Sequence, residues 1–343
     1  FKQVGKDFPV FLHPETKDEY ALARTERKTA PGYKGFSVDT GADVTLEEDL
    51  RRRDLTINAM AETADGTLID PYHGREDLDA GQLRHVSPAF AEDPVRVLRT
   101  ARFAAQFGKW GFKVAHSTNK LMRKMVAEGE VDHLVPERVW AELAKALRTD
   151  TPAKFFSVLR GCGALAVLFP EIDREYPQAG QAHGENSGGA ALDALQTSVA
   201  RSADPRVRFA VLVRALGQQL STEQRIDQAE TLCKRFRAPN DYSQLALSAI
   251  RLEQKVVSNE AEDVLDFMES SGTFKQNGRW HLLLSAYCAA GLIEQQHADT
   301  LIDLGEQLVS VNAANFAHLD LSGPSLGEAI RNKRLEILRT ATL

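Results

Sequence analysis

The chain has 343 residues, too many for one ordinary domain and enough for two or three. Hydrophobic residues make up 43% and charged residues 26%, which is ordinary for a globular protein, and no apolar run approaches the ~20 residues needed to cross a bilayer. The net charge of −6 does not favour a nucleic-acid partner, although local basic clusters matter more than the sum.

The cysteines and the first residues of the chain bear on its compartment and its completeness. Cys162, Cys233 and Cys288 are far apart and form no CxxC pair, which favours reduced thiols in a cytoplasmic protein over disulfides or a zinc site. The first residues also lack the pattern of a signal peptide. Because Phe1 falls within a strand-bearing region, we expect an N-terminal piece to be missing; a processed terminus would look the same.

The N-terminal part of the chain reads as mixed α/β. Short β-type runs at Phe8–Leu12 and Glu19–Arg24 flank a turn that contains proline. Gly, Pro and polar residues dominate Lys28–Asp43, which predicts a flexible loop. A charged helix over Leu46–Arg53 and a short apolar run at Ile57–Met60 follow.

The rest of the chain reads as helical. A long helix is predicted over Glu92–Phe107, with Ser87 or Asp93 as its cap, and Gln178–Ala190 is the best linker. We therefore predict an α+β fold with a head at 1–86, a neck at 87–170 and a helical body and tail at 171–343. Apolar residues three and four apart predict further helices at Val139–Leu147, Phe155–Leu165, Val207–Leu216 and Leu232–Phe236.

The first segment with chemical potential is Arg51–Arg53, followed by Asp54 and Asn58. Guanidinium groups suit phosphate oxygens because they donate bidentate, charge-assisted hydrogen bonds. The alternative is a solvated basic turn paired with the acidic residues at 47–49, and composition alone favours that alternative.

The second segment carries Asp93 followed by Arg96, Arg99 and Arg102. In a helix each step of three falls about 60° short of a full turn, so Asp93 and Arg96 are expected close together on one face while the later arginines drift around the helix. The alternative is one Asp–Arg ion pair and two solvated arginines, which contribute little.

A fixed aspartate beside a fixed arginine offers acceptors next to donors. Cytosine and adenine each present an amino group beside an acceptor nitrogen, whereas uracil and guanine present the reverse and would leave buried polar groups unpaired. Asp93 and Arg96 could therefore select C and A without a nucleic-acid template.

Several ordered motifs resemble one family. RRRDLTINA, IDPYHGREDL, HVSPAFAEDPVRVLRTARFAA and VPERVWAEL resemble the bacterial class II CCA-adding enzymes and their poly(A) polymerase relatives, and FPVFLHPETKDEYALARTERK resembles the CCA-adding branch. The resemblance covers residues 1–170 densely. It implies a nucleotidyltransferase head of the DNA polymerase β type, and the addition of C, C and A to the 3′ end of tRNA from CTP and ATP with Mg²⁺.

The resemblance also implies roles for single residues. Lys28–Asp43 matches the flexible loop linked to the switch from C to A addition, and Arg138 matches a motif whose role, structural or otherwise, is left open. The residues that match the family's nucleotide-binding motifs are Arg53, Asp54 and Asn58 for ribose and triphosphate, Asp93 and Arg96 for the base, and Arg99 and Arg102 on the same helix.

The metal carboxylates of the family are a departure. An Asp-x-Asp pair after a Gly-Gly-x-Val-Arg-Asp motif holds the metal there, and neither motif stands at a suitable place in this sequence; Asp77 and Asp79 match the spacing only. We expect the pair upstream of Phe1, with Glu19 as the third carboxylate or, alternatively, as an exposed strand residue. A chain that truly starts at Phe1 is predicted not to transfer nucleotides.

Two further expectations concern the helical body. Larger members of the family carry a His-Asp phosphohydrolase site, but Arg214 and Ala215 stand at the corresponding place, so we predict no such activity. Basic residues that could contact the tRNA backbone are Lys120, Arg123, Lys124, Lys234, Arg235, Arg237, Arg331, Lys333 and Arg334.

The alternative functions are a poly(A) polymerase and a truncated, inactive RNA-binding remnant. The absence of an Arg-rich tail weighs against the poly(A) polymerase.

Overall fold

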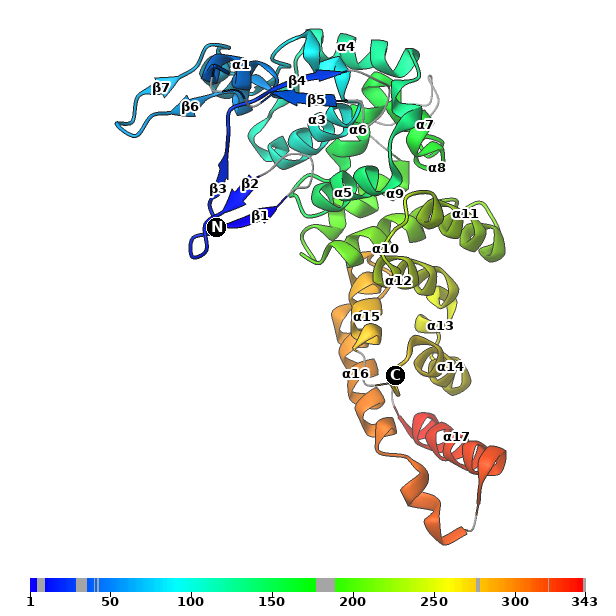
Figure 1. The fold of residues 1–343 in the computed structure, drawn as a ribbon. Helices are drawn as coiled ribbons and strands as arrows, with labels where there is room; N and C mark the ends of the chain where they lie inside the picture. The colour runs from blue at the N-terminus through cyan, green and yellow to red at the C-terminus, as the bar shows by residue number, and fades with distance from the viewer. Residues whose placement is uncertain are drawn as a thin grey trace. The chain divides into compact units, whose positions relative to one another are not determined.

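A computed structural model describes residues 1–4, 10–28, 36–39, 41, 43–176, 189–275, 278–319 and 321–341. The chain divides into two compact units, which are described separately below. Unit 1 comprises Phe1–Ala146 with Lys154–Leu168, and unit 2 comprises Leu147–Ala153 with Phe169–Leu343. The described strands lie in unit 1, whereas the described part of unit 2 is helical (Figure 1). The predicted α+β fold is confirmed.

Unit 1 begins with two small antiparallel sheets. The first has the order β1-β2-β3, and the second pairs β4 with β5. The prediction of a loop throughout Lys28–Asp43 is wrong, because Lys28 ends β4 and β5 pairs its backbone with β4; residues 29–35, 40 and 42 lie outside the described residues. The bounds are β1 (Lys2–Val4), β2 (Val10–Leu12), β3 (Glu19–Ala21), β4 (Thr25–Lys28) and β5 (Phe36–Asp39).

The next elements place the Arg51–Arg53 segment. Helix α1 (Leu46–Arg51) starts with a capping box in which Thr45 and Glu48 satisfy each other's backbone N–H groups. It ends two residues earlier than predicted, and the 3₁₀ turn η1 (Thr56–Asn58) follows. Helix α2 (Gly74–Asp79) packs tightly on η1, since a Cβ at Gly74 would lie 2.2 Å from the Thr56 carbonyl oxygen.

The remainder of unit 1 is built around helix α3 (Val95–Gln106), which packs against α5 (Pro136–Ala146). The predicted start at Glu92 is wrong, because η2 forms first and Asp93 is extended. The other elements of unit 1 are β6 (Ala61–Glu62), β7 (Leu68–Ile69), β8 (Gln82–Leu83), η2 (Pro88–Glu92), η3 (Gly108–Trp110), β9 (Lys113–Val114), α4 (His116–Ala127), η4 (Glu130–His133), α6 (Ala153–Cys162) and α7 (Ala164–Leu168).

Unit 2 has α10 at its centre, with Phe209, Ala210 and Val211 buried, and this helix packs against α9, α12 and α15. Most of the predicted linker lies outside the described residues, and Gly189 already begins α9. Its elements are α8 (Pro170–Asp173), α9 (Gly189–Ser198), α10 (Pro205–Ala215), α11 (Thr222–Arg235), α12 (Asn240–Arg251), α13 (Glu253–Val256), α14 (Ala261–Ser271), α15 (Arg279–Ala289), α16 (Gln295–Val309), η5 (Ala313–Leu319) and α17 (Gly323–Thr340).

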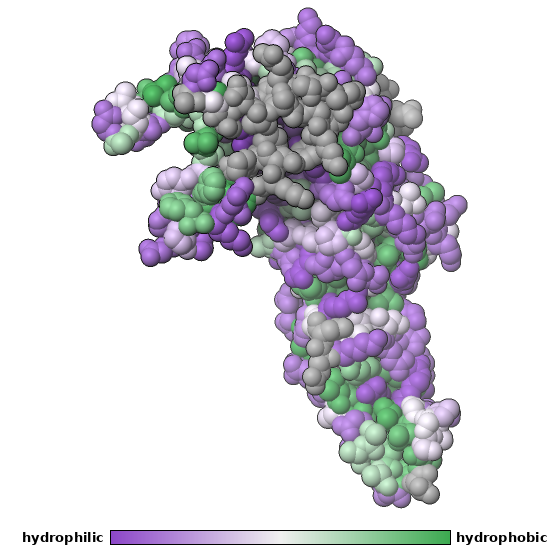
Figure 2. Space-filling view, in the orientation of Figure 1, coloured by the Kyte–Doolittle hydropathy of each residue, from purple (hydrophilic) through white to green (hydrophobic). Residues whose placement is uncertain are grey.

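The surface of unit 2 is mixed in character. Figure 2 shows hydrophobic residues gathered at the end formed by η5 and α17, where Leu319 is half exposed. Elsewhere in that view hydrophilic residues cover most of the helices of the unit. None of the described helices is both long enough and apolar enough to cross a membrane.

Candidate nucleotide-binding site

The centre of the site is an ion pair between Asp54 and Arg99. Asp54 follows α1 and is only 6% exposed, and its Oδ2 accepts a hydrogen bond from Arg99 Nε on α3 at 2.6 Å. Its Oδ1 accepts from Asn58 Nδ2 at 3.2 Å and from the Leu55 N–H at 3.0 Å. One carboxylate therefore fixes the η1 turn to helix α3, and it brings together three of the residues singled out in the sequence.

Electrostatics keep this pair ionised. Burial raises the pKa of Asp54, but the charge of Arg99 and the hydrogen bonds from Arg99, Asn58 and the Leu55 N–H outweigh it, so the pKa lies below its usual value. Burial likewise lowers the pKa of Arg99, and the attraction of Asp54 more than reverses this. The Arg99 side chain is 36% exposed, and its two terminal nitrogens make no hydrogen bond to other described residues. Those nitrogens are placed to donate to an anionic ligand.

Asp49 organises the preceding arginines. This buried carboxylate accepts from the Arg24 N–H at 3.1 Å, from Arg52 Nη2 at 2.7 Å and from Arg53 Nη2 at 3.3 Å. Arg53 also donates to the Asn58 carbonyl at 3.2 Å, and its side chain remains 44% exposed. The interpretation of a basic turn paired with residues 47–49 is thus correct for Asp49, and the exposed Arg53 guanidinium still borders η1.

Asp93 and Arg96 are neighbours, but each side chain has its own partner. The Arg96 N–H donates to the Asp93 carbonyl at 3.0 Å, while the Arg96 guanidinium donates to the carbonyls of Ala89 at 2.9 Å and Arg52 at 2.6 Å. Both Asp93 oxygens accept from Arg138 on α5, at 3.2 and 2.9 Å. Arg138, whose role the sequence left open, therefore holds the Asp93 carboxylate.

Arg102 has a different environment from Arg99. Its guanidinium is buried, donates to Glu142 Oε2 at 2.6 Å and to Gln106 Oε1 at 2.9 Å, and lies 3.9 Å from the centre of the Phe103 ring. These contacts join α3 to α5. The nucleotide-binding role that the resemblance implies for Arg102 stays a prediction, and the geometry favours a structural role.

The acidic residues considered for a metal lie apart. Glu19 is exposed on β3, opposite Leu12. Asp77 is buried and accepts from Thr56 Oγ1 at 2.7 Å, whereas Asp79 is exposed on the surface of α2. Across the described ranges no three His, Cys, Asp or Glu side chains form a group that could hold a metal ion. The described residues by themselves therefore do not form a metal site, and no reaction step is derived through one.

In unit 2, Arg214 occupies the end of α10, next to Ala215. Its Nη1 contacts Glu253 Oε2 at 3.1 Å, and Arg225 binds the same carboxylate. The position at which the resemblance would place a His-Asp pair thus holds a largely buried Arg–Glu–Arg network.

At least five of the nine basic residues considered for tRNA contact form ion pairs with acidic residues. Lys124 pairs with Glu128 at 3.7 Å, Lys234 with Glu230 at 3.0 Å and Lys333 with Glu336 at 2.9 Å. Arg235 contacts Glu171 at 3.0 Å, and Arg331 contacts both Asp266 and Glu269, at 2.8 and 2.6 Å. Such pairs reduce the positive charge that these side chains offer to a phosphate.

Two family models match the chain. A poly(A) polymerase head domain matches residues 5–84, and a probable RNA- and SrmB-binding site of polymerase A matches residues 111–176. The first match covers η1 and Asp54, and together with the site it defines the class of the protein, a nucleotidyltransferase.

Curated relatives narrow the class to a family. A multifunctional CCA protein of Thioalkalivibrio sulfidiphilus is 49% identical over 364 aligned positions, which cover 99% of this chain and 89% of the relative. The protein of the same description from Methylococcus capsulatus is 47% identical, with 99% and 86% covered. The chain belongs to the family of bacterial CCA-adding enzymes.

Solved structures agree in fold. The Bacillus stearothermophilus CCA-adding enzyme in complex with CTP has a TM-score of 0.65 at 20% identity, with 98% of this chain and 79% of that chain covered. A CCA-adding enzyme in complex with ATP has a TM-score of 0.57 at 20% identity, with 97% and 76% covered. At this identity the likeness concerns the fold alone.

Proposed function

We propose that this chain binds CTP and ATP and serves the stepwise addition of C, C and A to the 3′ end of tRNA. The observation that carries the proposal is the Asp54–Arg99 pair, which fixes η1 to α3 and leaves arginine donors exposed beside it. The family of the chain and the nucleotide complexes of its structural neighbours support the same choice of ligands.

In this proposal the phosphates and the ribose are held by residues around η1. Arg53 and the terminal nitrogens of Arg99 donate to the triphosphate, because guanidinium groups suit phosphate oxygens. Asn58 contacts the ribose while its amide is oriented by Asp54. Asp54 itself stays ionised and positions its neighbours.

The base is selected by Asp93 and Arg96. The carboxylate accepts from the amino group of C or A, and the guanidinium donates to the adjacent ring nitrogen. Arg138 holds Asp93 on both oxygens, and two backbone carbonyls hold Arg96, so neither side chain can turn easily to suit U or G. A mismatched base would turn a carbonyl oxygen toward the Asp93 carboxylate and an N–H toward the Arg96 guanidinium, and each polar group of the base left unpaired would cost about 1–3 kcal/mol.

Mg²⁺ is our choice for the divalent cation, since it prefers oxygen ligands and bridges phosphates. Glu19 remains the carboxylate that we assign near it from this part of the chain. The tRNA is the acceptor and is held by the helical body and tail, and the reduced cysteines favour the cytoplasm.

Titration calorimetry with the four ribonucleoside triphosphates tests the selection. We expect CTP and ATP to bind at least about tenfold more tightly than UTP and GTP. Incorporation of radiolabelled CTP into tRNA lacking its 3′ end then tests the transfer. Incorporation of ATP without any CTP would identify a poly(A) polymerase instead, and tRNA binding without nucleotide binding would identify an inactive remnant.

A further inference from the structure

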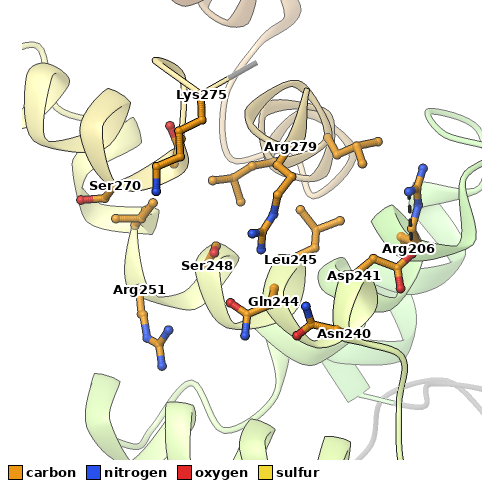
Figure 3. A pocket seen from close by; sticks show the side chains of 15 residues that line it. Arg206, Asn240, Asp241, Gln244, Leu245, Ser248, Arg251, Ser270, Lys275 and Arg279 are labelled. Carbon is orange, nitrogen blue, oxygen red and sulfur yellow. Dashed lines mark ion pairs between the residues drawn. The ribbon is translucent and has the colours of Figure 1, made fainter. Parts of the chain in front are cut away.

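Unit 2 contains a pocket that the nucleotide site does not use. Its volume is about 430 Å³, and it lies between the N-terminal part of α15, the end of α14 and one face of α12. Figure 3 shows Lys275 and Arg279 extending toward the face of α12 that carries Ser248 and Gln244. We call it the α12–α15 pocket.

The charge of the α12–α15 pocket is positive. Lys275, Arg279 and Arg251 line it from three different segments, and the Lys275 ammonium makes no hydrogen bond or ion pair within the described part of the chain. The acidic residue of the lining, Asp241, lies 3.8 Å from Arg206, which binds Asp204 more closely at 2.6 Å. The positive charge of the pocket is therefore assigned to its other cations and not to Arg206. Arg251 has only a long contact of 3.4 Å with Glu230.

Two helices begin at the pocket. Asn240 and Arg279 are the first residues of α12 and α15, and neither helix has a side-chain hydrogen bond at its N-cap. The N–H groups of a first helical turn lack partners within the helix and favour anions. Together with three cations, they make the pocket suitable for phosphate.

The rest of the lining indicates which part of a ligand is recognised. Ser248, Ser270 and Gln244 offer groups that can bind ribose hydroxyls and phosphate oxygens. The lining residues include leucines but no aromatic side chain, whereas proteins that bind unpaired bases stack them on aromatic rings. This chemistry fits a sugar–phosphate backbone better than a base.

We propose that the α12–α15 pocket binds phosphate groups of the RNA backbone, as a contact with the acceptor RNA that is separate from the nucleotide site. The inference rests on the proposed function for the identity of the RNA, and it assigns the contact to Lys275 and Arg279. None of the basic residues singled out from the sequence belongs to this pocket.

The test is the salt dependence of tRNA binding by the full chain, measured by fluorescence anisotropy. Log affinity falls as log salt concentration rises, and each of Lys275→Gln and Arg279→Gln should make this slope less steep by about one, equally for tRNAs of different sequence. The double variant should raise the Kd on the order of tenfold or more at low salt. Arg75→Gln is the control, because it removes one exposed positive charge from α2 of unit 1, outside the pocket and outside the helices assigned to tRNA, and should change neither quantity.

Melting curves by circular dichroism verify that the variants are folded. A folded double variant with unchanged tRNA affinity and salt slope would overturn the proposal. So would a loss of CTP or ATP affinity in the double variant with tRNA binding intact, because the pocket would then bind nucleotides. Failure of the proposed function looks different: the unaltered chain would bind no CTP, while its tRNA binding would still depend on Lys275 and Arg279.

Discussion

Arg138 donates to both carboxylate oxygens of Asp93, at 3.2 and 2.9 Å, although the two residues are 45 positions apart. The same carboxylate also accepts from the Val95 N–H at 3.1 Å, at the start of α3. Three donors therefore define where the Asp93 oxygens lie. Because α5 supplies two of them, the packing of α5 on α3 determines how Asp93 is presented.

Arg138→Lys should relax base selection while the protein stays folded. Lysine keeps the charge but cannot donate to both oxygens in the fixed geometry of a guanidinium. We expect the ratio of CTP to UTP affinity to fall roughly tenfold, about 1.4 kcal/mol. The overall affinity for nucleotides should change little. Calorimetry measures the ratio, and Arg75→Lys, in an exposed ion pair on α2, is the control. An unaltered ratio would reduce Arg138 to a packing residue.

Arg53→Ala and Arg96→Ala should have contrasting effects. Arg53 lies beside η1 with an exposed guanidinium, so its loss should weaken CTP, ATP and UTP alike, by about tenfold. Loss of Arg96 should affect discrimination instead and bring UTP closer to CTP. If Arg96→Ala still prefers C and A, the assignment of Arg96 to base selection fails. If Arg53→Ala binds nucleotides with unchanged affinity, Arg53 is a solvated surface residue.

The stability of unit 1 should depend on pH through Asp54 and Asp49. The pKa of each carboxyl lies below its usual value in the folded protein, since arginine charges and hydrogen bonds outweigh burial. A depressed pKa stabilises the folded state fully above the unfolded value of about 3.9, and this contribution is lost as the pH falls through the folded pKa.

Thermal melts from neutral pH down to below about pH 4 check this dependence. The unaltered chain should lose Tm at the acid end, and Asp54→Asn should start from a lower Tm and lose less of it. A matched acid-induced loss in both proteins would show that Asp54 does not contribute. Asp79→Asn is the control for an exposed aspartate, since its partner on α2 is the exposed Arg75, at 3.3 Å.

Arg102→Met tests whether Arg102 is structural. The Arg102–Glu142 pair is buried, and removing Arg102 leaves Glu142 with only the more exposed Lys145, at 3.2 Å, within the described part of the chain. Because Lys145 compensates part of the buried charge, we expect a loss of about 3 kcal/mol in the free energy of unfolding. Urea titration measures the loss, and a second change, Glu142→Gln, should recover part of it. The folded variant should bind CTP with unchanged affinity. A clear loss of CTP affinity would instead support the role in nucleotide binding that the resemblance implies.

The Arg214–Glu253–Arg225 network leads to a negative prediction. With arginines at this position, we expect no metal-stimulated release of phosphate from a 2′,3′-cyclic nucleotide. Chromatography of a 2′,3′-cyclic nucleotide incubated with divalent metal ions checks both ring opening to the monophosphate and the later release of free phosphate. A metal-dependent product that Glu253→Gln abolishes would prove the prediction wrong.

Local patterns in the sequence are sufficient to predict the helices and the types of residue that form the site. The periodic apolar positions predict helices where α5, α10 and α11 form. The sequence motifs also single out Asp54, Asn58 and Arg99, which are in contact in the structure. The ion pairs of the site cannot be predicted from local sequence in the same way. Asp54 meets Arg99 and Asp93 meets Arg138 across 45 residues each, and such contacts depend on how α1, α3 and α5 pack rather than on spacing along one helix.

The same reason explains why the sequence predicts a loop where β5 forms. Phe36–Asp39 has polar and glycine-rich neighbours, and its extended backbone is stabilised by hydrogen bonds to β4, a partner that single-sequence periodicity does not reveal. The three-residue spacing likewise predicts Arg96 next to Asp93, but it does not predict the other partners of the Arg96 guanidinium. The carbonyl groups of Ala89 and Arg52, which hold its guanidinium, carry no side-chain signal in the sequence.

Asp49 limits what evolution or an engineer can place at its position. Its two oxygens serve a backbone N–H and two guanidinium groups at once. Asparagine would turn an amide NH₂ toward one of those donors, and alanine would leave all three donors without this acceptor. Glutamate would need space for another methylene at a buried position. A library randomised at codon 49 and sorted for folded protein should therefore return aspartate almost alone.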